Sequence, residues 1–109
     1  MSLRVEKINE LIKNHLGEII SRELNMKSGV FITISKVDTS PDLRYTRVFV
    51  SIFPEKETGY AKKALQNEIY RIQGNLNKKL NMKPIPRVTF LIDSTESEAQ
   101  KVEDILKEL

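Results

Sequence analysis

The chain lacks several residue types on which whole classes of protein depend. Its 109 residues include no cysteine and a single histidine, His15. Disulfide bonds are therefore excluded, and a zinc site of nitrogen and sulfur ligands has too few donors. His15 lies within an apolar helical stripe, where a structural role is more common than a catalytic one. No Ser/His/Asp or Cys/His set has sequence support, so we expect neither an enzyme nor a bound cofactor.

Long apolar runs are also absent. No run approaches the ~20 residues that a membrane-spanning helix needs. The opening residues, MSLRVEKINE, lack the apolar stretch of a signal peptide. A hydrophobic content of 39% with 30% charged residues is ordinary for a globular protein. We therefore expect a monomeric cytoplasmic protein with one modest core and no membrane partner.

Positive charge is concentrated in one part of the chain. The net charge is only +3, but residues 61–87 hold seven lysines and arginines against one glutamate. The final segment, 95–109, is acidic. A basic block of this kind indicates a polyanionic partner, whereas on charge alone a solvated lysine-rich helix face is an equally good interpretation.

The spacing of apolar residues predicts the order of helices and strands. Three- and four-residue spacing predicts helices over 2–24, over about 58–81 and over 95–109, and two-residue alternation predicts strands over 30–35, 48–53 and 87–92. The Ser40-Pro41-Asp42-Leu43 turn between the first two strands predicts an antiparallel hairpin. Because the helical stripes must be buried against the sheet, we predict a two-layer α+β domain.

Gly74 interrupts the second predicted helix on its polar side. It projects away from the apolar stripe, among Asn67, Tyr70, Arg71 and Lys78. A glycine inside a helix costs ~1 kcal/mol relative to alanine, and on this face close helix packing does not offset that cost. We therefore predict either a break of the helix at Gly74 or close approach of an anionic ligand to its bare backbone.

Several stretches of the sequence resemble the ribosome-binding factor A family. They are Arg4-Val5 to Arg22-Glu23-Leu24, Val37 to Leu43, Val48 to Ser51, Gly74-Asn75-Leu76 to Lys79-Leu80, Pro86 to Phe90 and Asp93-Ser94. The resemblance covers nearly the whole chain, and the run V-x-x-SPDL-x-x-x-x-V-x-V-S is its most specific part. In that family an Ala-x-Gly kink replaces the GxxG loop with which KH domains clamp nucleic-acid backbone. The alanine corresponds to Ile72 here, which is a departure from the pattern.

The resemblance implies a KH type II-like fold with a mixed three-stranded sheet. It implies an RNA-binding domain over residues 1–94 and an acidic helical extension over 95–109. Members are non-enzymatic assembly factors that bind the free 30S ribosomal subunit. They act in late maturation and 5′-end processing of its 16S ribosomal RNA, especially in the cold, with assembly GTPases as candidate further partners.

The basic segment supplies the residues that we predict to contact RNA. They are Lys63, Arg71, Gln73, Gly74, Asn75, Lys78, Lys79, Lys83 and Arg87. Lysine and arginine there would neutralise phosphates and release counterions. The alternative is a small protein-interaction module that uses a sheet edge or the acidic last helix and has no nucleic-acid role. Salt-dependent RNA binding distinguishes the two.

Overall fold

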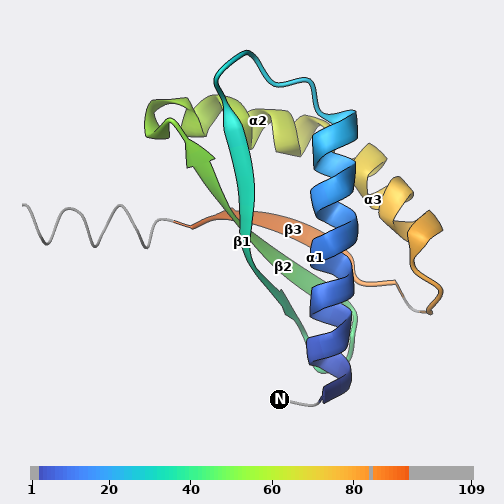
Figure 1. Ribbon diagram of the computed structural model, residues 1–109. Helices are drawn as coiled ribbons and strands as arrows, with labels where there is room; N and C mark the ends of the chain where they lie inside the picture. Colours follow the sequence, from blue (N-terminus) through green and yellow to red (C-terminus); the bar gives the residue numbers. More distant parts are fainter. Residues whose placement is uncertain (1–2, 84, 94–109) are drawn as a thin grey trace, which may run out of the picture.

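The computed structural model describes residues 3–83 and 85–93. The elements are α1 (Leu3–Glu23), β1 (Phe31–Thr39), β2 (Tyr45–Phe53), the short 3-10 helix η1 (Glu55–Glu57), α2 (Thr58–Asn67), α3 (Ile69–Lys79) and β3 (Arg87–Ile92). The predicted α+β class and mixed three-stranded sheet are confirmed (Figure 1). The helix predicted over 95–109, and the boundary proposed at residue 94, lie outside the described residues.

The sheet has the order β1-β2-β3, with β2 in the centre. β1 and β2 form the predicted antiparallel hairpin, and β3 is parallel to β2. A parallel strand needs a long crossover connection, and α2 and α3 provide it. The tight turn between β1 and β2 is closed by a hydrogen bond of 2.9 Å from the Leu43 N–H to the Ser40 carbonyl.

A β-bulge in β1 reverses which side chains face the core. Up to Ile34 the even-numbered residues point inward, as the alternation predicts. The register shifts between Ile34 and Lys36, after which Val37 and Thr39 are buried. Thr39 forms a buried hydrogen bond of 2.9 Å between its hydroxyl and that of Thr46. The extra residue lets β1 run four residues beyond its predicted end.

The three α-helices of the described residues lie on one face of the sheet. α1 packs on β1, α2 on β2 and β3, and α3 on both α1 and β3 (Figure 1). Their apolar faces meet the inward side chains of the strands in one core, whose most buried members include Ile12, Leu16, Val48, Leu65 and Ile72. Among the described residues no helix covers the opposite face, which we call the open face of the sheet.

The break in the second helical region lies at Glu68, six residues before the predicted position. α2 ends at Asn67 and α3 begins at Ile69, and α3 passes through Gly74 without interruption. The prediction of a break at Gly74 is therefore wrong. Continuous apolar spacing from Leu65 to Leu76 does not reveal the break, because each half is buried against different neighbours.

Candidate nucleic-acid interface

Backbone hydrogen bonds are kept on both sides of the break at Glu68. Glu68 has φ −101° and ψ 8°, outside the helical region. Its N–H still donates to the Ala64 carbonyl at 3.2 Å, and its carbonyl accepts from the Ile72 N–H at 2.9 Å. No glycine or proline stands at the junction, so packing of α2 on β2 and of α3 on α1 must set its angle.

Gly74 has no packing reason to be glycine. It is half-buried in the middle of α3, and a Cβ built on it would meet no heavy atom within 4 Å outside its own helix. Ile72, which replaces the alanine of the family's pattern, is fully buried in the core, and the helix is unbroken around it. The remaining prediction for Gly74 is that its open backbone allows a ligand to approach.

Arg71 is held by two carboxylates. Its guanidinium lies 2.6 Å from a carboxylate oxygen of Glu23 on α1 and 3.8 Å from one of Glu68 at the break. These ion pairs connect α3 to the end of α1 and leave no net positive charge on the three side chains. No pattern in the sequence indicated Glu23 as a partner, because 48 positions separate the two residues.

Gln73 fastens the start of β3 to α3. Its amide nitrogen donates to the Pro86 carbonyl at 3.1 Å, and its amide oxygen accepts from the Val88 N–H at 2.8 Å. The same nitrogen also donates to Asn77 at 3.0 Å. The side chain thus takes the place of a neighbouring strand at the outer edge of β3. The Gln73 side chain is thus used within the protein's own hydrogen bonding. Asn75, on the same helix, is half-buried.

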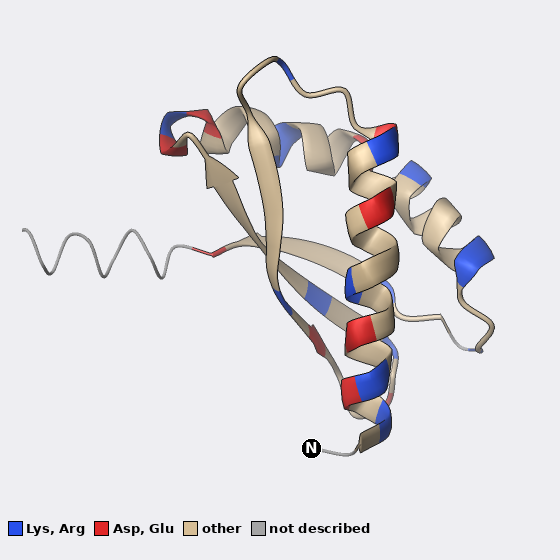
Figure 2. Ribbon diagram, in the orientation of Figure 1, with Lys and Arg blue, Asp and Glu red and all other residues tan. Residues whose placement is uncertain are grey.

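Three lysines at the end of α3 form the strongest positive feature of this segment. Lys78 and Lys79 lie in the last turn of α3 and Lys83 lies just after it, all exposed (Figure 2). None of them forms an ion pair with a residue in the described ranges. A helix C-terminus carries about half a negative charge, which favours such cations but neutralises only part of their total. We call these three residues the lysine cluster.

The remaining charged residues of the prediction lie on other elements. Lys63 is exposed on α2, before the break, and Arg87 is exposed at the first position of β3. A shallow groove of about 260 Å³ runs between the α2–α3 junction and β3, lined by Gln66, Ile69, Val88, Thr89 and Phe90. The nine predicted residues therefore differ in role: the lysine cluster has no ion-pair partner among the described residues, whereas Arg71 and Gln73 link α3 to α1 and β3.

The described residues show little sign of other chemistry. They contain no group of three or more histidine, aspartate or glutamate side chains placed to hold a metal ion. Within the same ranges, no helix is both long and apolar enough to cross a membrane. His15 is half-buried on α1. The feature of the described residues that could bind a ligand is the positive charge of the lysine cluster, at the end of the two helices that meet at Glu68.

The order of the elements and their pairing define the class of the domain. A helix, an antiparallel hairpin, two helices joined at a break and a parallel third strand make a KH type II-like domain. A family model described as ribosome-binding factor A matches residues 4–106. The chain belongs to the ribosome-binding factor A family.

Individual members of that family are similar to the chain in sequence and in structure. Ribosome-binding factor A of Prosthecochloris aestuarii is 35% identical over 99% of this chain and 90% of its own length. The crystal structure of the Thermus thermophilus protein has a TM-score of 0.69 at 25% identity, covering 81% of this chain and 93% of that one. A Thermus thermophilus model fitted into the cryo-EM map of a 30S–RbfA complex has a TM-score of 0.64 at 30% identity, covering 76% and 88%.

Proposed function

We propose that this chain is a non-enzymatic assembly factor that binds the 30S ribosomal subunit through its 16S ribosomal RNA. The observation that carries the proposal is the lysine cluster, three exposed cations without ion-pair partners among the described residues. Membership of the ribosome-binding factor A family supports the choice of the ribosome as the polyanion. The choice of the small subunit is supported by the similar Thermus thermophilus model, which was fitted into the cryo-EM map of a 30S–RbfA complex.

The lysine cluster would act by neutralising phosphates. Each lysine that replaces a condensed counterion releases that ion to solution, which makes binding favourable at low salt and weak at high salt. α3 presents two of these lysines on a helix that is tied to α1 by Arg71 and to β3 by Gln73. The backbone that carries these lysines is therefore already ordered, and the conformational entropy lost on binding RNA is mainly that of the lysine side chains.

The finer parts of the proposed role rest on membership of the ribosome-binding factor A family. We propose that the chain acts in late maturation of the small subunit, including 5′-end processing of 16S ribosomal RNA, and that its role is greatest in the cold. We further propose that it works in the cytoplasm as a monomer, alongside assembly GTPases on the same subunit.

Pelleting with purified 30S subunits at several salt concentrations tests the lysine cluster. Replacing Lys78, Lys79 and Lys83 together by glutamine should weaken binding and reduce the slope of log affinity against log salt. Each phosphate contact that is lost should lower that slope by about 1. Arg71 stays unchanged, because its ion pairs with Glu23 and Glu68 make its loss a change of structure as well as of charge.

A matched variant separates position from net charge. Replacing Lys7, Lys13 and Lys56 by glutamine removes the same three charges from exposed sites on α1 and η1. This control should keep most of the affinity and nearly all of the slope. Equal losses in the two variants would mean that only net charge matters, and no loss in either would refute RNA binding through the lysine cluster.

A further inference from the structure

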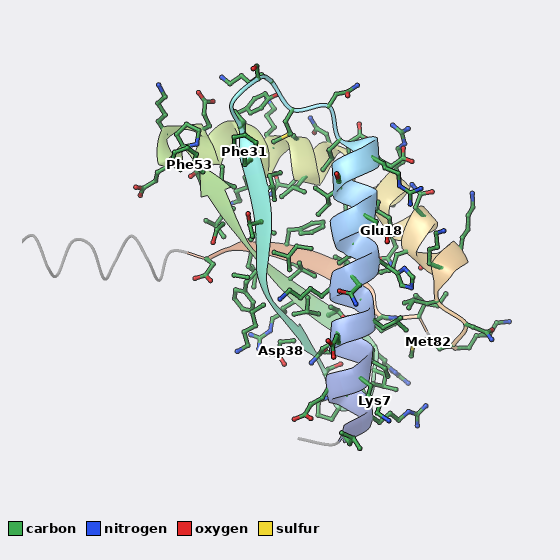
Figure 3. The ribbon with its side chains drawn as sticks, in the orientation of Figure 1. Lys7, Glu18, Phe31, Asp38, Phe53 and Met82 are labelled. Carbon is green, nitrogen blue, oxygen red and sulfur yellow. The ribbon has the colours of Figure 1, made fainter. Side chains whose placement is uncertain are left out.

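The open face of the sheet carries aromatic side chains that the core does not use. Phe31, Phe53 and Tyr45 are 62%, 69% and 59% exposed. Phe31 and Phe53 are register partners on β1 and β2, so they stand beside each other at one end of the face (Figure 3). Tyr45 begins β2 at the opposite end. Side chains on the same face of a strand recur every second residue, so these aromatics belong to one surface.

Cations lie beside the half-buried Phe49, a further ring of the open face in the middle of β2, and beside Tyr45. The Lys36 ammonium is 5.9 Å from the centre of the Phe49 ring, and the Arg47 guanidinium is 5.8 Å from it. Arg87 on β3 is the register partner of Tyr45. Lys36 and Arg87 make no ion pair with any residue in the described ranges, whereas Arg47 is paired with Asp38.

Between the exposed aromatics the open face is mixed, with the half-buried Phe49 paired with Leu91 in its middle and polar residues around them. Thr33 and Ser51 are register partners next to the pair of phenylalanines, and Thr89 is paired with Arg47. The face thus carries aromatic rings and one leucine with hydroxyl groups and cations between them, and it is not one continuous apolar patch. A protein partner that buries a large apolar area fits this pattern poorly. Unpaired RNA bases fit it well, because each base needs one ring to stack on and each phosphate needs a nearby cation.

We propose that the open face stacks unpaired bases of ribosomal RNA on Phe31, Phe53 and Tyr45, with Lys36 and Arg87 facing the neighbouring phosphates. This second RNA surface rests on the proposed function, but it uses different residues and lies on the side of the sheet away from α3. The lysine cluster supplies charge without regard to base, whereas the open face contacts the bases themselves. The two surfaces together would hold a single-stranded stretch next to a backbone-contacting helix.

An inserted tryptophan can report stacking directly, because the chain contains no tryptophan. In Phe31→Trp, titration with a uridine decamer RNA should quench the fluorescence in a saturable way, since a stacked base lies against the indole. Leu11→Trp places the reporter at an exposed site on α1 instead, and its fluorescence should change little. Equal responses at the two sites would overturn the proposal.

Affinity measurements separate stacking from apolar contact and from the lysine cluster. Phe31→Leu keeps an apolar side chain but removes the ring, and it should weaken binding of the decamer and of 30S subunits about tenfold, the equivalent of roughly 1.4 kcal/mol. Phe31→Trp should retain the affinity. The salt slope should stay unchanged in both, because no phosphate contact is lost.

The outcomes distinguish failure of this proposal from failure of the proposed function. If Phe31→Leu binds like the unchanged protein while the lysine variant binds weakly, the open face is not an RNA surface and the proposed function stands. If neither variant matters and the subunit does not bind, both fail. If Phe31→Leu instead changes only the sedimentation of the free protein, the face is a protein contact and the stacking proposal is refuted.

Discussion

At the scale of single residues, the turn between β1 and β2 depends on one carboxylate. Asp42 accepts hydrogen bonds from the Ser40 hydroxyl and, at 3.1 Å, from the Arg44 N–H. The bond from Ser40, and after it the bond from the Arg44 backbone, lower the pKa of Asp42 below its ordinary value of 3.8. The ionised form is therefore the one that the folded state favours, and it holds a turn in which Leu43 has a positive φ of 63°.

A lowered pKa in the folded state gives stability that is present above the unfolded pKa and is lost as the pH falls through the folded one. Asp42→Asn should therefore unfold at a lower urea concentration than the unchanged protein at pH 7. The difference between their midpoints should shrink as the pH falls below about 4. The effect should be small because the carboxylate is exposed. A difference that is the same at pH 7 and pH 3 would show that the charge of Asp42 does not matter to the fold.

The sequence located the polar and basic residues of α3 but could not show which of them bind other parts of the protein. Lys78 and Lys79 were predicted as RNA contacts and are exposed at the end of α3. Arg71 and Gln73 were predicted with them on the same grounds. Their partners Glu23 and Val88 come from distant parts of the chain. Only the packing of α3 against α1 and β3 brings these groups together, so no local pattern could reveal them.

At the scale of elements, α3 is a continuous helix at Gly74, and this makes a clear prediction. Gly74→Ala should raise the free energy of unfolding by about 1 kcal/mol, since alanine restricts the unfolded chain and no neighbouring atom obstructs the added methyl group. Binding to 30S subunits should remain within a few-fold of the original if the RNA does not touch this backbone. Urea denaturation and subunit pelleting on the one variant measure both.

The opposite result would have a specific meaning. If Gly74→Ala gains no stability and loses binding, RNA approaches the bare backbone or α3 bends there in the complex. A change of the same kind at Gly17, an exposed glycine within α1 that also has open space around it, is the control. Gly17→Ala should stabilise the protein in either case and leave binding unchanged.

Elements with strong alternation were predicted correctly, and irregular features were not. β3 has the predicted bounds, Arg87–Ile92, because prolines precede it and its apolar residues alternate. The bulge after Ile34 and the break at Glu68 were missed. Neither has a glycine or proline to mark it. The helix break lies where the packing partners change from β2 to α1, and the bulge lies where the register of β1 on β2 shifts. Apolar spacing records burial without recording partner or register.

At the scale of the whole molecule, the sheet divides the domain into two unlike sides. One side is a single apolar core under three helices, and the other is the open face with its aromatic rings. The sequence predicted the first side through its apolar stripes. It did not predict the second side, although Phe31 and Phe53 lie at outward positions of the alternation. The sequence does not show that all the described helices cover the same face, so it does not show that these phenylalanines are exposed.

The core should respond to truncation according to depth of burial, and α3 offers a matched pair of isoleucines. Ile72 is fully buried between α1 and the sheet, whereas Ile69, three residues earlier on α3, is half-buried. Ile72→Ala should lower the free energy of unfolding by about 2–5 kcal/mol, through lost burial and the cavity it leaves. Ile69→Ala should cost less than about 2 kcal/mol, because solvent fills part of the space. The two variants make the same chemical change in one helix, so differences in helix propensity largely cancel. Urea denaturation measures both losses, and an unchanged m-value would mean that their difference arises from packing in the folded state. Equal losses would show that Ile72 is no more deeply buried than Ile69.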